Sequence, residues 1–319
     1  MAKQRLTDQQ RRRIEVAQER HREQVTPGGE HGLVITRFGK QVLIETQDGE
    51  QISTTLRRHV KDPVAGDQVI WQPQGEGGVI EALLPRQTVI SRPNSQGKLR
   101  PIAANIDRLL VVVAPQPEAQ ANLIDRYLVA ANHAGMETTL VVNKGDLLRE
   151  TPTVMDMANA YRALGHSVVI TDQDSDPHAE ALRSTIGHQT LALVGQSGVG
   201  KSSLANRLLP DHDIRVGDLS SAAGLGRHTT TAAALYHLPG GGRLIDSPGV
   251  REFHLSHLPQ EAVANGFIEF APLLGSCRFR DCSHSHEKGC AILESVERGD
   301  ISASRLASYH QIVASMTGD

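Results

Sequence analysis

The glycine-rich segment LALVGQSGVGKSSL, residues 191–204, constrains the fold of this chain more than any other feature. An apolar run typical of a buried strand is followed by the spacing Gly195-x4-Gly200-Lys201-Ser202, and a helical pattern begins near Ser202. In a phosphate-binding P-loop the backbone N–H groups turn toward a phosphate and the next helix presents its N-terminus to it. The alternative is a chance glycine-rich turn, but such a turn does not require a strand before it and a helix after it. The residues predicted to surround the nucleotide are Gly195, Gln196, Ser197, Gly198, Val199, Gly200, Lys201, Ser202 and Ser203.

The region around this loop alternates between buried-strand and helical patterns. The strand candidates are residues 108–114, 139–143, 167–171, 190–194 and 242–246. Helical patterns lie between several of them, at residues 123–134, 154–164 and 202–209. This alternation predicts a largely parallel sheet in an α/β domain.

Two further residues of this region are typical of a metal-assisted phosphate site. Lys201 is predicted to bridge the β- and γ-phosphate oxygens, and the Ser202 hydroxyl is predicted to ligate Mg2+. The run RLIDSPG ends a strand with Asp246-x-x-Gly249, where Asp246 can hold Mg2+ through water and the Gly249 amide can sense the γ-phosphate. Alone, this second motif is weak and could be an ordinary turn. About 45 residues after a P-loop, it fits the neighbouring strand of the same sheet.

The sequence Asn143-Lys144-Gly145-Asp146 follows the apolar run TLVV and indicates which base is bound. An aspartate carboxylate accepts hydrogen bonds from both N1–H and the N2 amino group of guanine, a pairing that adenine does not offer. Asn143, Lys144 and Asp146 therefore predict GTP rather than ATP as the nucleotide. An ATP-dependent metabolic kinase is disfavoured.

The N-terminal part of the chain has a different composition. Residues 1 to about 24 form a basic segment with almost no apolar periodicity, which reads as a solvated arm or helix, with RNA contact as the alternative. Five short β-type runs follow between residues 32 and 84, and they predict a small barrel such as an OB-fold. Residues 91–97 read as a linker. Candidates for a phosphate-facing surface on the barrel are Arg37, Lys40, Arg57, Arg58, His59 and Lys61, against the alternative of ordinary surface charge.

Composition excludes several classes of protein. The formal net charge is −3, which gives no global sign of a nucleic-acid binder. The longest apolar run is about six residues, far short of a membrane span, and no apolar stretch follows the charged N-terminus as in a secretory signal. We expect a cytoplasmic protein with no membrane contact.

All three cysteines of the chain fall within one short segment with the pattern Cys277-x4-Cys282-x-His284-x5-Cys290. Three thiolates and an imidazole suffice for a closed tetrahedral zinc site, which leaves no open position for catalysis. The odd number of cysteines is a poor disulfide framework. We therefore predict one structural Zn2+. The charged neighbours Arg278, Arg280, His286 and Lys288 are candidates for contact with RNA or protein.

The order of the motifs is unusual, because the guanine motif at residue 143 precedes the P-loop at 195 and the Asp246 motif. A circularly permuted G domain is expected from this order. The chain closely resembles the RsgA (YjeQ) family of small-ribosomal-subunit-dependent GTPases over nearly its whole length. The resemblance implies a basic arm at residues 1–30, an OB-fold domain at 31–98, a permuted G domain at 99–254 and a zinc-binding, partly helical domain at 255–319. It also implies His284 rather than His286 as the zinc ligand.

The same resemblance assigns residues 224–231, GLGRHTTT, to a switch I segment. It implies that Thr230, with Thr229 as the alternative, ligates Mg2+ and reports the γ-phosphate, and that His228 takes part in hydrolysis. With Lys201, these are the candidate catalytic residues. Val250 stands where Ras-type proteins use glutamine to orient water, which predicts slow intrinsic hydrolysis.

Two positions depart from the family pattern. Gly145 replaces a larger residue and is expected to loosen its loop, and Thr171 occupies the place of a small serine next to the guanine. Neither change removes a residue of the guanine motif.

The resemblance implies a monomeric cytoplasmic GTPase that binds the small ribosomal subunit and its rRNA, assists late maturation and hydrolyses GTP to GDP with stimulation by the subunit. The alternative is a nucleotide-gated RNA or protein interaction switch with negligible turnover.

Overall fold

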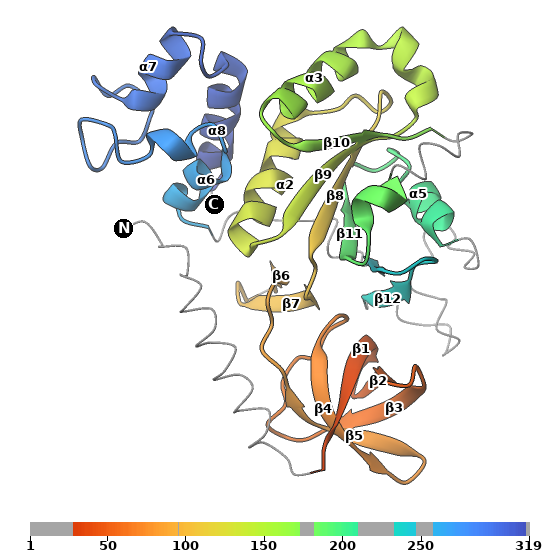
Figure 1. Ribbon diagram of the computed structural model, residues 1–319. Helices are drawn as coiled ribbons and strands as arrows, with labels where there is room; N and C mark the ends of the chain where they lie inside the picture. Colours follow the sequence, from red (N-terminus) through yellow and green to blue (C-terminus); the bar gives the residue numbers. More distant parts are fainter. Residues whose placement is uncertain (1–27, 95, 173–181, 210–232, 247–257, 317–319) are drawn as a thin grey trace. The chain divides into compact units, whose positions relative to one another are not determined.

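The computed structural model describes residues 28–94, 96–172, 182–209, 233–246 and 258–316. The chain divides into two compact units, Met1–Asn105 with Ala232–Leu235, and Ile106–Thr231 with Tyr236–Asp319 (Figure 1). Each unit has its own core. Among the described residues, no helix combines the length and apolarity that a bilayer span requires.

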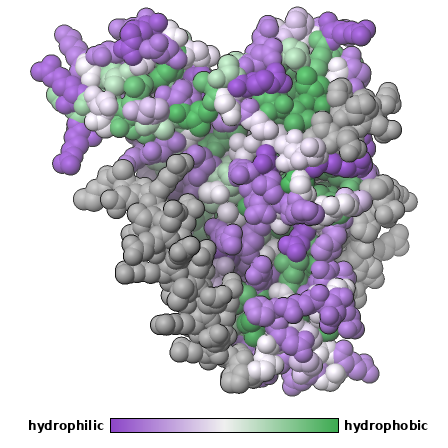
Figure 2. All heavy atoms as spheres, viewed as in Figure 1, coloured by the Kyte–Doolittle hydropathy of each residue, from purple (hydrophilic) through white to green (hydrophobic). Residues whose placement is uncertain are grey.

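The first unit contains the predicted barrel, built from β1 (Glu30–Phe38), β2 (Gln41–Thr46), β3 (Gln51–Leu56), β4 (Gln68–Gln74) and β5 (Gly77–Leu83). β1 pairs antiparallel with both β2 and β4, and β3 pairs parallel with β5, so the five strands close in the manner of an OB-fold. Its core consists of Val34, Val42, Ile44, Val60, Val69, Trp71 and Ile80. Trp71 is therefore part of the core, while hydrophilic residues predominate on the visible surface of the barrel (Figure 2).

The segment predicted to be a linker is instead part of a β-hairpin, which corrects that expectation. β6 (Val89–Pro93) pairs antiparallel with β7 (Leu99–Ala104). Between them, the Asn94 side-chain carbonyl accepts hydrogen bonds from the backbone N–H groups of Gln96 (3.0 Å) and Lys98 (2.9 Å). Asparagine favours turns for this reason, so the polar composition that suggested a linker in fact forms a tight connection.

The second unit is built on a parallel sheet with the strand order β10 (Ser167–Ile170), β9 (Glu137–Val142), β8 (Arg108–Val113), β11 (Thr190–Val194) and β13 (Arg243–Asp246). Four of these strands lie within a predicted strand candidate, and β9 begins two residues before its candidate at 139–143. Strand β12 (Ala234–His237), which precedes β13 in the chain, is divided between the two units. The helices α2 (Ala121–Ala134), α3 (Pro152–Ala163) and α5 (Lys201–Leu208) connect the strands, as the sequence predicts to within about two residues.

The C-terminal part of the second unit is a small helical module formed by α6 (Gln260–Gly266), α7 (Ala291–Glu297) and α8 (Ala303–Met316). The rings of Phe267 and Phe270 stack 4.9 Å apart, and both meet Tyr309 of α8 edge-on. Val129 and Ala130 of α2 belong to the same apolar cluster. The module is therefore packed against a helix of the parallel-sheet domain.

Candidate nucleotide-binding site and metal centre

The carboxyl edge of the parallel sheet gathers the predicted nucleotide residues. β9 ends next to Asn143, β10 next to Thr171, β11 next to Gly195, and β13 ends with Asp246. Because all four strands run in the same direction, motifs separated by about a hundred residues meet at one edge. Ligands of open α/β sheets bind at this edge.

Two glycines of the P-loop are required by their surroundings. Gly195 has φ +139°, and a Cβ there would lie 2.1 Å from the carbonyl oxygen of Val112. Gly200 has φ +92°, and a Cβ there would lie 2.2 Å from the side-chain nitrogen of Asn143. Only glycine combines this backbone conformation with so close an approach. The second contact places the P-loop directly against the guanine motif.

Lys201 begins α5 and is largely buried within the P-loop. Its Nζ atom donates hydrogen bonds to the carbonyl oxygens of Gly195 (2.7 Å) and Gln196 (2.5 Å). The ammonium group is therefore held over the loop that the phosphates of a nucleotide would occupy. Such an arrangement provides positive charge without ordering a flexible side chain at binding.

Asn143 is buried and ties three loops together. Its side-chain nitrogen donates to the carbonyl oxygen of Val199 (2.9 Å), and its side-chain oxygen accepts from the Thr171 hydroxyl (3.0 Å). The Thr171 backbone N–H donates to Val142 (2.8 Å), so this amide is already hydrogen-bonded inside the protein. Thr171 thus supports Asn143 through its side chain.

Lys144 provides a second contact between the guanine motif and the P-loop. It has φ +56°, and its Nζ atom donates to the carbonyl oxygens of Gln116 (2.6 Å) and Gly198 (2.8 Å). Asp146 follows at the start of a short 3-10 helix, η1 (Gly145–Glu150), and its side chain is exposed. Lys144 therefore has a structural role, while the Asp146 carboxylate is accessible to a base.

The loop that was expected to be loose at Gly145 is closely packed. The Gly145 N–H donates to the carbonyl oxygen of Thr171 (2.9 Å). A Cβ at position 145 would lie 3.0 Å from Ile170 Cγ2 and 3.2 Å from the same carbonyl oxygen. A larger residue would require these neighbours to move, so glycine fits the local packing.

Ser202 and Asp246 provide oxygen ligands of the kind that Mg2+ prefers. Ser202 is half-buried in the first turn of α5, and Asp246 is buried at the end of β13. Burial and the charge of the Asp246 carboxylate raise the pKa of Tyr236 to about 12, so the negative charge of Asp246 acts within a poorly solvated region. A hard divalent cation would compensate this charge.

Several predicted site residues lie outside the described residues. These are His228, Thr229, Thr230, Gly249 and Val250, together with the basic arm.

The structure brings the four predicted zinc ligands together. The ligand atoms of Cys277, Cys282, His284 and Cys290 all lie within 4.8 Å of one another. His284 Nδ1 is 3.6 Å from the Cys277 sulfur and 3.5 Å from the Cys290 sulfur, and these two sulfurs are 3.9 Å apart. A tetrahedral zinc with ordinary bond lengths separates its ligand atoms by roughly 3.6 to 3.8 Å. The cluster therefore fits Zn2+.

The loop that carries His284 is held in place by Glu287 and α8. His284 has φ +61°, and its carbonyl oxygen contacts His310 Nε2 at 2.9 Å. The Glu287 carboxylate accepts hydrogen bonds from the Ser283 hydroxyl (2.5 Å) and the Ser283 N–H (2.7 Å), and these two bonds hold its pKa below the usual range. It also accepts a hydrogen bond from the Ser285 N–H (3.0 Å). Desolvation raises the pKa of the Cys282 thiol to about 12, so a bound cation is needed to keep it as a thiolate at neutral pH.

Sequence reasoning missed a buried ionic cluster between α2 and the C-terminal module. Arg305 of α8 forms ion pairs with Asp125 of α2 and with Glu269, and its Nε is 2.5 Å from a Glu269 oxygen. The Tyr161 hydroxyl donates to Asp125 (2.6 Å), and the Arg305 guanidinium lies 4.5 Å from the centroid of the Phe267 ring. A single arginine in a helical pattern gives no sequence signal of this role.

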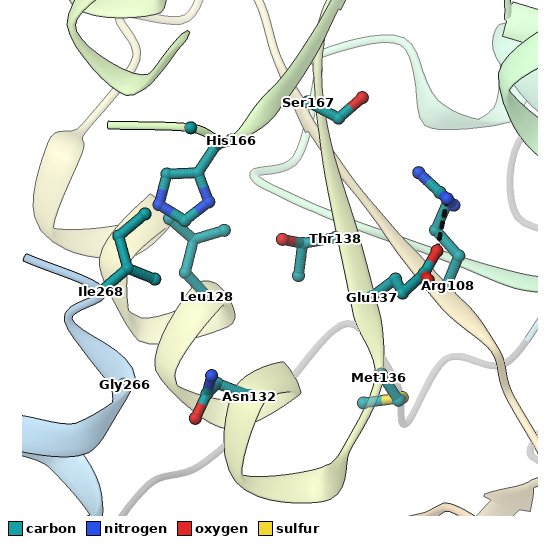
Figure 3. Close-up of a pocket in the computed structure, with 11 residues that line it drawn as sticks. Arg108, Leu128, Asn132, Met136, Glu137, Thr138, His166, Ser167, Gly266 and Ile268 are labelled. Carbon is teal, nitrogen blue, oxygen red and sulfur yellow. Dashed lines mark hydrogen bonds and ion pairs between the residues drawn. The ribbon is translucent and has the colours of Figure 1, made fainter. Parts of the chain in front are cut away.

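A pocket of about 300 Å³ lies at the opposite, amino edge of the sheet (Figure 3). It is lined by the start of β8 and β9, the end of α2 and Gly266. Its cation, Arg108, already donates to Gln189 (2.6 Å) and Thr139 (2.8 Å) and pairs with Glu137. The Arg108 charge is therefore satisfied by partners inside the protein rather than left for a phosphate.

Comparison with known proteins identifies the family of this chain. A family model described as RsgA GTPase matches residues 83–256. A protein of Pseudomonas aeruginosa PAO1 named small ribosomal subunit biogenesis GTPase RsgA is 47% identical, and the alignment covers 99% of this chain and 98% of that protein. The chain belongs to the RsgA GTPase family. A second RsgA relative, from Pseudomonas putida KT2440, is 46% identical over 100% of this chain and 99% of its own length.

Solved structures of RsgA-like proteins have the same fold. The crystal structure of YjeQ from Thermotoga maritima is 30% identical, with a TM-score of 0.75, and the match covers 91% of this chain and 99% of that one. The structure of YloQ, a circularly permuted GTPase, is 25% identical with a TM-score of 0.72 and covers 90% and 95% of the two chains. The RsgA-family chain described here is thus a GTPase with a permuted G domain, an N-terminal β-barrel and a C-terminal Cys3His cluster, and it uses GTP and Mg2+ as this family does.

Proposed function

We propose that this chain hydrolyses GTP to GDP on the small ribosomal subunit and thereby assists late maturation of the subunit. The observation that carries the nucleotide part is the direct packing of the guanine motif on the P-loop, through Asn143 to Val199 and Lys144 to Gly198. The ribosomal part rests on the names of relatives that are 46% and 47% identical over almost the full chain.

In this proposal the nucleotide lies along the carboxyl edge of the sheet. Asp146 accepts hydrogen bonds from the guanine edge, and Lys201 stabilises the charge on the β- and γ-phosphates. Ser202 and Asp246 would hold Mg2+, which supplies charge neutralisation of the phosphates when bound. Thr230 would complete the metal ligands and sense the γ-phosphate, the Gly249 amide would also contact this phosphate, and His228 would assist hydrolysis.

The flanking parts of the chain supply the contacts to rRNA. We place a basic arm at 1–30, the OB-fold at 31–98, the G domain at 99–254 and the zinc domain at 255–319. On the barrel, Arg57 pairs with Glu81 and Arg37 with Asp62, whereas Arg58, Lys40 and Lys61 are exposed. The exposed cations favour contacts to the RNA backbone. The chain acts as a monomer in the cytoplasm, with Zn2+ as a structural metal.

The decisive experiment measures GTP hydrolysis by the purified protein alone, with purified small ribosomal subunits and with large subunits as the control. We expect strong stimulation by small subunits only. The matched variant Lys201→Ala should show no stimulated turnover, because the phosphate charge is no longer stabilised. Tight GTP binding without stimulation by small subunits would contradict the proposal.

A further inference from the structure

The zinc loop of the C-terminal module exposes an aromatic ring. The Phe279 side chain is 48% exposed, and among the described residues only Val89 and Leu99, both in the β6–β7 hairpin, are comparably exposed large hydrophobic side chains. Phe279 lies between the zinc ligands Cys277 and Cys282 in the sequence Cys-Arg-Phe-Arg-Asp-Cys. A single exposed apolar side chain is not unusual by itself, so its surroundings decide whether it has a role.

The backbone around Phe279 is fixed on both sides. The N–H of Arg278 donates to the carbonyl oxygen of Gly289 (2.9 Å), and the two metal ligands bracket the loop. The Arg278 guanidinium lies 5.7 Å from the centroid of the Phe279 ring. The ring is therefore presented on a short, rigid loop, so little conformational entropy is lost when a partner binds it.

Three cations lie around the ring. Arg278, Arg280 and Lys288 are exposed, and no carboxylate of the described residues forms an ion pair with any of them. Of the two acids of the loop, Asp281 is exposed, and Glu287 is used internally by the hydrogen bonds from Ser283 and Ser285. Hydrophilic residues extend from the outer edge of this module in Figure 2.

We propose that Phe279 stacks on an unpaired nucleobase of the small-subunit RNA, while Arg278, Arg280 and Lys288 contact the flanking phosphates. An exposed ring with a cation on either side along the chain is the combination by which proteins bind single-stranded RNA. A protein partner would require a larger apolar surface around the ring, whereas here the neighbouring exposed residues are charged. This proposal rests on the proposed function, because it takes the ribosomal subunit as the source of the RNA.

The test compares three substitutions at one position in the full-length, zinc-loaded protein: Phe279→Ala, Phe279→Leu and Phe279→Trp. Affinity for purified small ribosomal subunits is measured in the presence of a non-hydrolysable GTP analogue. Loss of one base stack should weaken binding by roughly 5- to 140-fold in the alanine variant. The leucine variant should be similarly weak because it retains apolar surface but no ring, and the tryptophan variant should bind at least as tightly as the wild type.

A second variant, Arg280→Ala, separates phosphate contact from stacking. Log affinity falls as log salt concentration rises, and Arg280→Ala should make this slope shallower by about 0.7, because one phosphate contact is lost. The Phe279 variants should leave the slope unchanged. Zinc content and thermal unfolding of each variant report whether the module remains folded.

Each outcome has a distinct meaning. Wild-type affinity in Phe279→Ala, with binding of the wild type itself intact, overturns the stacking site and leaves the proposed function standing. Wild-type affinity in Phe279→Leu also overturns it and indicates an apolar contact with a ribosomal protein instead. A wild-type protein that does not bind small subunits at all overturns both proposals.

Discussion

At the scale of single residues, the proposed base selection depends on the exposed carboxylate of Asp146. Replacing Asp146 with Asn should lower affinity for GDP by roughly 100-fold or more, because an amide cannot accept both guanine hydrogen bonds. The same variant should gain affinity for xanthosine diphosphate, whose C2 carbonyl accepts a hydrogen bond from the amide. Equilibrium binding of both nucleotides to the wild type and the variant measures this exchange. Unchanged GDP affinity in the variant would place the base elsewhere.

Gly200 provides a test of the contact between the P-loop and Asn143. Gly200→Ala should abolish tight GTP binding, because the new Cβ would collide with the Asn143 side chain as well as strain the backbone. Gly135→Ala is the matched control, since Gly135 has φ +77° but no atom within 4 Å of an added Cβ. It should cost about 1 kcal/mol in unfolding free energy and keep nucleotide binding.

Nucleotide affinity and chemical unfolding are measured on both glycine variants. The comparison separates the collision with Asn143, which only Gly200→Ala introduces, from the backbone strain that both variants share. Equal GTP affinity in the two variants would mean that the P-loop can move away from Asn143 without losing its function.

These residues also show which features of the site can be predicted from the sequence and which cannot. The proximity of the P-loop and the guanine motif could be predicted because each motif follows a strand, and the carboxyl ends of parallel strands lie at the same edge of the sheet. The hydrogen bonds from Lys144 to Gln116 and from Thr171 to Asn143 could not be predicted from the sequence, because they join segments that are distant in the chain. The tight packing of Gly145 was hidden for the same reason.

At the scale of elements, α2 and α8 are joined by buried charges whose removal should be costly. Arg305→Met should lower the free energy of unfolding by about 3 to 5 kcal/mol, because it leaves Asp125 and Glu269 buried without their partner. Arg298→Met is the control, since the Arg298–Asp300 pair is exposed and should contribute only about 0 to 1 kcal/mol.

The defect in Arg305→Met should become smaller at acid pH. Burial already raises the pKa of Asp125, and without the arginine this carboxyl group would take up a proton more readily. Denaturant unfolding at neutral and mildly acidic pH tests both parts. Equal losses of stability in the Arg305 and Arg298 variants would show that the buried cluster contributes no more than a surface pair.

The elements themselves were predictable to different degrees. Strands of the parallel sheet are continuous apolar runs, and their positions were found within a few residues. The β6–β7 hairpin was missed because its turn residues resemble those of a linker, and turn composition alone does not tell whether the flanking strands pair. The contact of α8 with α2 depends on tertiary packing that no local pattern encodes.

At the scale of the whole molecule, the zinc centre and the nucleotide site should be separable. Cys282→Ala should reduce zinc content from about one equivalent per chain to near zero, because three ligands hold the metal much less tightly than four. The C-terminal module should then lose its stability, since metal binding supplies a large part of the folding free energy of such small modules. GTP binding should change little, because its residues lie at the carboxyl edge of the sheet. Ser285→Ala is the control, as it keeps all four ligands and the backbone N–H that donates to Glu287.

Metal analysis, limited proteolysis and nucleotide affinity measured on the same preparations give the answer. Unchanged zinc in Cys282→Ala would refute the metal centre. Loss of GTP binding together with zinc would mean that the packing of the module on α2, through Val129 and the Arg305 cluster, is needed to hold the nucleotide site in shape. The two variants together therefore decide whether the C-terminal module is an independent attachment or a part of the GTPase core.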